Sequence, residues 1–370
     1  MSAAELDARL LATIADWSAG GVGCDDPAFD EHARALFLHQ VERNEPYARF
    51  AAACGYSQER PPATWREIPA VPSSAFKDAV LATFDVALAE LEFHTSGTTV
   101  ARSGRHFVER ATLYDAASLA GFDRFVLADR APIRFLNLVP NPRFRKHSSL
   151  GYMVGHASVL RGDGAAAYFL EGDSVDVEGF ANALDAAIAA GRTVCITGTA
   201  FAFVAALDAF ETAERRFVAF SGSRVMETGG FKGRTRVVAR DELYARLEDR
   251  FAIPQTSIVA EYGMTELLSQ LYDDESSRTS AIRVKVAPPW LRTLVVDGDG
   301  REVAFGETGF LRHVDLANRS SVVAVQTEDR GYARDGGIVL LERDLDAPPR
   351  GCSLDAEELL GAHATARPDR

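Results

Sequence analysis

Five small or hydroxyl-bearing residues, Thr95-Ser96-Gly97-Thr98-Thr99, stand together in the segment EFHTSGTTVARSGRHF. Glycine lets the backbone approach a ligand closely, and hydroxyl and main-chain N–H groups can surround phosphate oxygens. The alternative is a solvated turn, because serine, threonine and glycine are common in turns. The chain contains no G-x-x-x-x-G-K-[ST] motif, and no G-x-G-x-x-G motif follows a predicted strand. The segment is therefore a candidate phosphate-binding loop of another kind.

A second segment, IVAEYGMTELLSQLY, leads from a β-type run through Gly263 into a spacing of apolar residues that predicts a helix. A strand that turns at a glycine beside an aromatic ring can hold a nucleotide, with Tyr262 stacked on the base. Thr265 and Glu266 would then face the phosphates and Mg²⁺, a hard cation that prefers oxygen ligands. Taken alone, Glu266 is more simply a favourable charge at the start of a helix.

A third segment, RVMETGGFKGR, carries the adjacent glycines Gly229 and Gly230. Two glycines in a row allow the backbone to approach a planar ligand closely. The alternative interpretation is a hairpin turn.

The net charge of −13 over 370 residues excludes several classes of partner. An acidic surface repels both a nucleic-acid backbone and an anionic membrane surface, so we expect neither partner. No apolar run approaches the roughly 18 residues of a membrane span, and acidic residues occupy the N-terminal positions where a signal peptide is basic.

Cysteines and lysines are few. The four cysteines lie far apart and form no C-x-x-C pair, which argues against a disulfide framework or a zinc site and favours a reducing, cytoplasmic compartment. Lysine chemistry has few candidates, since 36 of the 40 cations are arginines. The lysines are Lys77, Lys146, Lys232 and Lys285.

Helix and strand patterns alternate through the middle of the chain. Helical spacing marks about 4–17, 29–54, 111–121, 176–190, 201–213 and 241–250. Short apolar runs predict buried strands at Arg134–Val139, Thr193–Ile196, Phe217–Phe220 and Ile258–Ala260. This alternation predicts an α/β fold, with helices packed on largely parallel sheets.

The pattern changes near residue 280 to strands with hairpin signals, as in LVVDGDGREV, which predicts a smaller β-rich lobe. The predicted organisation is a core over 1–343, with this lobe from about 280, and a short C-terminal arm over 344–370. The arm begins with a connector that contains Pro348-Pro349, continues with a predicted short helix over Leu354–Leu360 and carries Cys352.

Taken together, the segments TSGTT, ETGG, EYGMTE and QTEDRG resemble, in their order, the adenylate-forming enzyme superfamily over roughly 70–352. Within it they look most like the acyl-protein synthetases, the fatty-acid ligases of bacterial luminescence type. The features behind this choice are VPSSAFKD, HSSLGYM, TGTAFAF, ETGGFKG and RGCSL.

The resemblance implies ATP, Mg²⁺ and a carboxylic acid as ligands. It places Thr95, Ser96, Gly97, Thr98 and Thr99 around the phosphates. It places Gly229, Gly230, Tyr262 and Gly263 near adenine, Thr265 and Glu266 on the phosphate and Mg²⁺ side, with Glu266 as metal ligand, and Asp329 on the ribose hydroxyls. Alone, Asp329 is a surface loop residue.

The implied reaction forms an acyl-adenylate and then transfers the acyl group to a thiol. The family carries its acylated cysteine in a segment that matches RGCSL, so the resemblance implies that Cys352 takes the acyl group and passes it to a partner protein. Only 18 residues follow Cys352. The resemblance therefore implies that the separate C-terminal domain with its catalytic lysine is absent, and Lys77 or Lys232 is the candidate substitute.

Two other functions stay open. One is an AMP-forming acyl- or aryl-CoA ligase of the phenylacetate type, in which coenzyme A accepts the acyl group. The other is an inactive nucleotide-binding scaffold, because Val100 stands where the superfamily loop has glycine. The segments HSSLGYM and TGTAFAFVAAL are candidates for an apolar acyl pocket, and the alternative is that their large apolar residues belong to the ordinary core. His147 is a candidate to face the carboxylate, with a solvent-exposed loop histidine as its alternative.

Overall fold

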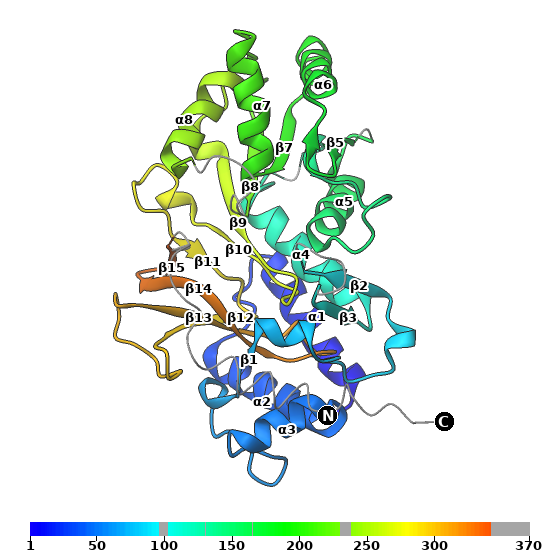
Figure 1. Cartoon of the computed structure of the whole chain (residues 1–370), viewed down its shortest axis with the longest axis vertical. Coiled ribbons are helices and arrows are strands. Elements are labelled where there is room, and N and C mark those ends of the chain that lie inside the picture. Colours follow the sequence, from blue (N-terminus) through cyan, green and yellow to red (C-terminus); the bar gives the residue numbers. More distant parts are fainter. Residues whose placement is uncertain (96–102, 130, 165, 230–237, 342–370) are drawn as a thin grey trace. The chain divides into compact units, whose positions relative to one another are not determined.

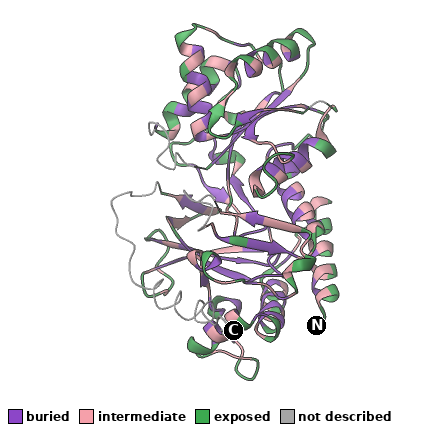
Figure 2. Cartoon of the chain, turned by 45° about the vertical axis from the view of Figure 1, so that its right-hand side comes forward, coloured by how far each residue is buried: buried purple, intermediate pink, exposed green. Residues whose placement is uncertain are grey.

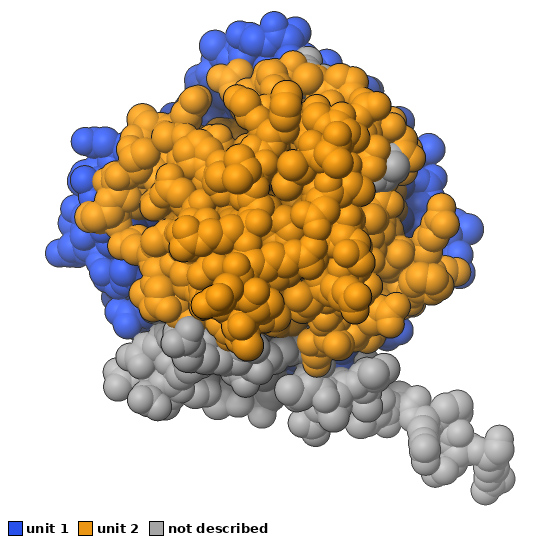
Figure 3. Space-filling model, turned by 90° about the horizontal axis from the view of Figure 1, so that it is seen from above, with its two compact units in different colours: residues 1–117, 264–269, 287–370 blue, residues 118–263, 270–286 orange. Residues whose placement is uncertain are grey.

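A computed structural model describes residues 1–95, 103–129, 131–164, 166–229 and 238–341 (Figure 1). The chain divides into two compact units, shown in different colours in Figure 3. The first unit contains 1–117, 264–269 and 287–370, and the second contains 118–263 and 270–286.

The second unit is built on a sheet in the order β11-β10-β9-β8-β7-β4-β5-β6. The five strands from β9 to β5 are parallel, and β10, β11 and β6 pair antiparallel at the edges. The strands are β4 (Arg134–Pro140), β5 (Ala167–Glu171), β6 (Ser174–Val175), β7 (Val194–Thr199), β8 (Arg224–Thr228), β9 (Ile258–Tyr262), β10 (Leu271–Asp273) and β11 (Lys285–Val286).

Helices cover this sheet, as parallel strands require. The helices are α4 (Ala111–Phe125), which begins in the first unit, α5 (Ser149–Arg161), α6 (Val177–Ala189), α7 (Ala200–Thr212) and α8 (Arg240–Phe251). Helices α6, α7 and α8 share one buried cluster with the sheet, centred on Phe180, Phe203 and Leu247. On the other face of β4, Phe122 of α4 packs on Phe135 at 6.0 Å. Figure 2 shows the strands mostly buried and the helices exposed along one side.

The first unit combines helices with antiparallel strands. Its sheet runs β12-β13-β14-β15, and β1 joins β14 in parallel. A separate hairpin pairs β2 with β3. The elements are α1 (Ala3–Ser18), α2 (Asp26–Arg43), α3 (Glu45–Ala53), β1 (Val71–Pro72), the 3-10 helix η2 (Ser73–Lys77), β2 (Leu91–His94), β3 (Arg105–Val108), β12 (Leu291–Val296), β13 (Thr308–Asp315), β14 (Ala324–Arg334) and β15 (Gly337–Leu340).

The predicted α/β class with a largely parallel sheet is confirmed, and so is the turn in LVVDGDGREV. There the N–H of Asp297 donates to the carbonyl of Arg301 at 2.8 Å, and Gly300 takes a positive φ of 78°. Asp297-Gly298 and Asp299-Gly300 supply the residues that such a turn needs.

The single helix predicted over 29–54 is wrong, because the chain forms α2 and α3 with a break at Asn44. The Asn44 side chain accepts from the N–H of Tyr47 and caps the new helix. Pro46 follows in the first turn of α3, where it is tolerated, but it removes the N–H that a continuous helix would need.

The strand predicted over Phe217–Phe220 is also wrong. The N–H groups of Phe217 and Ala219 donate to the carbonyls of Arg250 and Phe251 at the end of α8. Carbonyl groups at the C-terminal end of α8 therefore satisfy the backbone N–H groups of this segment. The side chains of Val218 and Phe220 are exposed to solvent.

The helix predicted after Gly263 does not form, and a turn leads into β10 instead. The N–H of Leu268 donates to the side chains of Asp315 (3.0 Å) and Asn318 (3.1 Å), and the Ser269 hydroxyl donates to Asp315 at 2.7 Å. These buried side chains satisfy the backbone in an irregular conformation, so tertiary contacts override the local helical pattern.

Candidate active site

The base of the TSGTT loop lies in the β2–β3 hairpin of the first unit. Thr95 and Gly104 face each other across it: the N–H of Thr95 donates to the carbonyl of Gly104 at 2.9 Å, and the N–H of Gly104 donates to Oγ1 of Thr95 at 2.8 Å. The predicted phosphate-binding residues Ser96, Gly97, Thr98 and Thr99 lie outside the described residues. The hairpin thus fixes both ends of the loop.

The segment VPSSAFKD packs against this base through η2. A Cβ on Gly104 would approach the carbonyl carbon of Phe76 to 3.1 Å, so only glycine fits without displacement. Lys77 follows Phe76 directly, and its side chain is exposed. Its position next to the loop base is compatible with the role predicted for a lysine, and that role stays a prediction.

The segment Met264–Ser269 brings Thr265 to the same hairpin. The Thr265 hydroxyl donates to the carbonyl of His94 at 3.4 Å, one residue before Thr95. Glu266 is 8% exposed, and its carbonyl oxygen accepts from the amide of Asn318 at 2.8 Å. Two motifs about 170 residues apart in the sequence therefore meet within one unit.

Asp329, the predicted ribose ligand, lies on β14 of the first unit. Its side chain is partly buried, and its N–H donates to Oγ1 of Thr327 at 3.2 Å. The residue is thus part of an ordered strand, whereas the sequence alone indicated a surface loop.

In the second unit, Gly229 and Tyr262 lie at the carboxyl ends of adjacent parallel strands. Thr228 is the register partner of Glu261, so the next residues, Gly229 and Tyr262, continue side by side. Gly229 has a positive φ of 72°, and a Cβ there would meet nothing within 4 Å. Gly263 follows Tyr262 and is exposed. The carboxyl edge of a parallel sheet is the usual place for a ligand. Gly230 and Lys232 lie outside the described residues.

Two buried glutamates, Glu227 and Glu261, stand just before these residues, and no pattern in the sequence indicates a role for either. Burial raises the pKa of Glu227 to about 7, against the attraction of Lys285. Burial also raises the pKa of Glu261 to about 7, and the neighbouring Glu227 carboxylate adds to the effect. Each has a hydroxyl donor: Tyr244 donates to Glu227 at 3.1 Å, and Thr228 donates to Glu261.

The titration of Glu227 is expected to lower the free energy of unfolding as the pH rises from about 4.5 to about 7. Its folded carboxyl keeps a proton up to about 7, whereas an unfolded glutamate loses it near 4.3. The folded state therefore binds more protons in this window, and its stability decreases with rising pH. In Glu227→Gln this contribution disappears, so urea denaturation at a series of pH values should give a slope of the unfolding free energy against pH that is more positive than in the wild type by up to about 1.4 kcal/mol per pH unit. Glu178→Gln, at an exposed glutamate of α6, is the control, and equal slopes for Glu227→Gln and wild type would contradict the expectation.

A buried cluster of three charged residues lies near Glu227 in the second unit. Asp273 pairs with Arg283 and Lys285, each at 2.8 Å, and all three side chains are at most 4% exposed. Lys285 also donates to the carbonyl of Ala260 at 2.6 Å. Burial opposes ionisation of Asp273, but the two cations hold its pKa below the ordinary value. The cluster joins β9, β10 and β11.

Of the predicted acyl-pocket segments, TGTAFAF lies largely in the core of the second unit, whereas HSSLGYM is mostly half-buried. Met153 is 2% exposed and Phe203 is fully buried, whereas Leu150 and Phe201 are partly exposed. HSSLGYM forms the start of α5, where the Ser148 side chain accepts from the N–H of Gly151. His147 is exposed.

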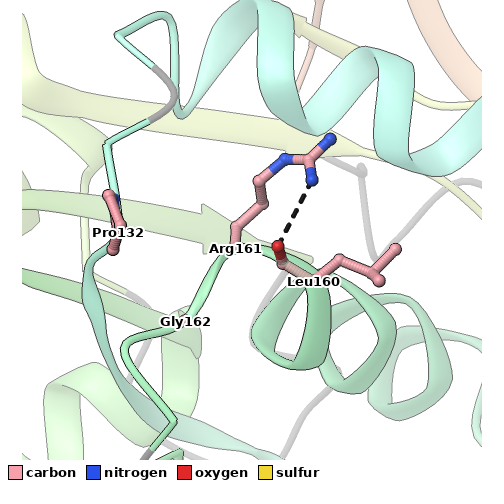
Figure 4. A pocket seen from close by; sticks show the side chains of 4 residues that line it. All are labelled: Pro132, Leu160, Arg161 and Gly162. Atoms are coloured by element: carbon pink, nitrogen blue, oxygen red, sulfur yellow. Dashed lines mark hydrogen bonds between the residues drawn. The ribbon is translucent and has the colours of Figure 1, made fainter.

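A small surface pocket lies at the end of α5, lined by Pro132, Leu160, Arg161 and Gly162 (Figure 4). The Arg161 guanidinium is bound by Asp123 at 2.7 and 2.8 Å. None of the predicted site residues lines this pocket, so it has no part in the candidate site.

Cys352, the predicted acyl carrier, lies outside the described residues. Among the helices that the structure describes, none is both long enough and apolar enough to cross a membrane.

Comparison with solved structures identifies the class of fold. The chain is similar to a 2-hydroxyisobutyryl-CoA ligase in an open conformation in complex with 2-HIB-AMP and CoA, with a TM-score of 0.62 and 14% identity over 83% of this chain and 65% of that one. It is similar to the same ligase in the postadenylation state in complex with R3-HIB-AMP, with a TM-score of 0.61 and 14% identity over 83% and 63%. The chain thus has the fold of the adenylate-forming enzymes, and it spans less than two thirds of the length of these solved chains.

Comparison with curated proteins adds a particular relative. The chain is similar to a long-chain-fatty-acid–luciferin-component ligase from Vibrio harveyi, with 21% identity over 345 residues, which are 89% of this chain and 87% of the relative. No family model matches the chain. The resemblance predicted from TSGTT, ETGG, EYGMTE and QTEDRG is confirmed.

Proposed function

We propose that the protein activates a carboxylic acid with ATP and Mg²⁺ as an AMP-forming ligase. One observation carries this proposal: the Thr265 hydroxyl bonds to His94 beside the base of the TSGTT loop. Both segments supply the oxygen and N–H groups that a polyphosphate and its hard cation require. Two independent solvated turns would not explain why these two segments meet within one unit.

Each unit by itself carries groups that suit a part of a nucleotide. Gly229 has open space where a Cβ would stand, next to Tyr262 at the end of the neighbouring strand, so a planar base can approach the backbone there. In the first unit, Thr265, Glu266 and Asp329 offer hydroxyl and carboxylate oxygens. Mg²⁺, when bound, neutralises charge on the phosphate oxygens, and Glu266 is the residue that would hold it.

In the proposed reaction the substrate carboxylate attacks the α-phosphorus of ATP. A bond forms between the carboxylate oxygen and the phosphorus, and the bond to the bridging oxygen breaks, which releases pyrophosphate and leaves an acyl-adenylate. Both reactants are anionic, so the protein acts by holding the groups in line and by stabilising negative charge. Thr265 and the TSGTT loop would position the phosphates, and Asp329, as a two-oxygen acceptor, would bind the ribose diol.

The substrate class proposed is a fatty acid, in keeping with the name of the Vibrio harveyi relative. The acyl group would then pass to the Cys352 thiolate, which attacks the mixed anhydride and releases AMP, and from the thioester to a partner protein. Arg350 and Gly351 precede Cys352 in the RGCSL segment, and a nearby cation favours a thiolate.

Exchange of labelled pyrophosphate into ATP tests the proposal directly. We expect exchange that requires Mg²⁺ and a carboxylic acid, and that is faster with long-chain fatty acids than with acetate or benzoate. The absence of exchange with every acid of the panel would favour an inactive nucleotide-binding scaffold.

The same assay with Cys352→Ser separates the acceptors. We expect exchange to persist and labelled acyl-enzyme to disappear, because adenylation precedes the thiol step. If acyl-CoA is produced at the wild-type rate by the Ser variant, coenzyme A is the acceptor and the acyl-enzyme is excluded.

A further inference from the structure

His106 connects the hairpin that carries the TSGTT loop to two other segments of the first unit. Its ring is fully buried on β3, two residues after Gly104 at the loop base. Nδ1 lies 2.7 Å from the carbonyl oxygen of Thr265, and Nε2 lies 2.9 Å from Oγ of Ser321. The Phe76 ring packs on the imidazole in a T-shaped arrangement, with the ring centroids 5.4 Å apart. Both ring nitrogens therefore have partners, and Phe76 packs on the ring.

The partners determine the protonation of the ring. A carbonyl oxygen can only accept, so Nδ1 must carry the proton that is donated to Thr265. Nε2 of the neutral ring then accepts from the hydroxyl of Ser321. Burial lowers the pKa of His106 to about 4, so the ring is neutral near pH 7 and keeps this direction of hydrogen bonds.

Thr265 and Glu266 are thereby held from both sides. His106 fixes the Thr265 carbonyl, while Asn318 donates to the Glu266 carbonyl at 2.8 Å and accepts from the N–H of Leu268 at 3.1 Å. Asn318 and Ser321 belong to the same turn between β13 and β14. The turn and the hairpin together orient a segment that forms no helix or sheet of its own.

We propose that His106 is a positioning residue for adenylation: it sets the Thr265 hydroxyl and the Glu266 carboxylate relative to the phosphate-binding loop. The inference rests on the proposed function and adds a residue that touches no substrate. Small displacements of positioned groups lower rates strongly, so loss of this contact is expected to weaken productive ATP binding.

The test compares His106→Leu with His106→Asn and with a matched control. Asparagine retains a donor near the position of Nδ1, whereas leucine fills the site without a hydrogen bond. His32→Leu is the control, because His32 is 1% exposed on α2 of the same unit and burial lowers its pKa to about 4 as well. We expect His106→Leu to raise KM for ATP in pyrophosphate exchange about tenfold, His106→Asn to recover most of this loss, and His32→Leu to leave KM unchanged.

Hydrogen exchange supplies a readout that does not need activity. We expect the amides of Glu266–Ser269 to exchange faster in His106→Leu than in His32→Leu when the two variants are compared at equal global stability. Equal exchange of these amides, or an unchanged KM for ATP in His106→Leu, overturns the proposal. If the wild-type protein activates no acid, the proposed function fails, and the hydrogen-exchange comparison still decides whether His106 holds the segment.

Discussion

Replacing Glu266 with glutamine is expected to lower carboxylate-dependent ATP–pyrophosphate exchange by about 100-fold or more, the usual effect of losing one preorganised electrostatic contact. Glutamine keeps the size of the side chain but removes the negative charge proposed to bind Mg²⁺. Glu266 is buried, with 8% of the residue exposed, so water has little access to replace the missing ligand. Initial rates at saturating ATP, measured over a range of Mg²⁺ concentrations, give the effect.

The fold should survive this change. Asn318 contacts the main-chain carbonyl of Glu266, which the substitution leaves in place. Glu42→Gln, at an exposed position of α2, is the matched control and should keep wild-type exchange. Wild-type rates and an unaltered Mg²⁺ dependence in Glu266→Gln would remove this residue from the metal site.

Replacing Asp273 with asparagine is expected to lower the free energy of unfolding by about 3–5 kcal/mol. The substitution leaves Arg283 and Lys285 as two buried cations without their anion, and both are at most 4% exposed. It also alters the oxygen that accepts from the N–H of Ala260 at 3.0 Å. Urea denaturation followed by circular dichroism measures the loss.

Asp185→Asn is the control for Asp273, because Asp185 pairs with Arg215 on the surface with 56% of its side chain exposed. Exposed pairs contribute little, so a loss below about 1 kcal/mol is expected there. Combining Asp273→Asn with Lys285→Met should recover part of the larger loss, since one uncompensated charge is removed. Equal losses for Asp273→Asn and Asp185→Asn would show that burial does not govern the energy of this cluster.

The alternation of helix and strand predicted the class of fold because each pattern has its own period. Short apolar runs predicted β4, β7 and β9. The sequence of β8, RVMET, interrupts such a run with a glutamate. β8 was missed for that reason. A buried glutamate carries no signal in the sequence, since its burial depends on Tyr244 and Lys285 from other elements.

The candidate site was predictable as a set of motifs and not as a set of contacts. TSGTT and EYGMTE were recognised by residue type and by their order along the chain, since Gly, Ser and Thr are also common in ordinary turns. The support of Thr265 was not predictable, because His106 lies 159 residues away in the sequence and Asn318 fixes Glu266 from 52 residues away. The apolar spacing of Leu267 and Leu268 indicated a helix, yet both residues are buried by a turn that only the complete first unit supplies.

In the first unit, Gln40 near the N-terminal end contacts a turn that is synthesised much later, at residues 318–323. Gln40 of α2 donates to the carbonyls of Asn318 and Arg319, and it accepts from the N–H of Val323 at 2.8 Å. During synthesis on the ribosome, this amide leaves the exit tunnel some 280 residues before its partners do. It must stay hydrated until then, so the N-terminal helices cannot reach their final packing while the second unit is being translated. A nascent chain halted before Asn318 would therefore display an unfinished first unit to chaperones and proteases.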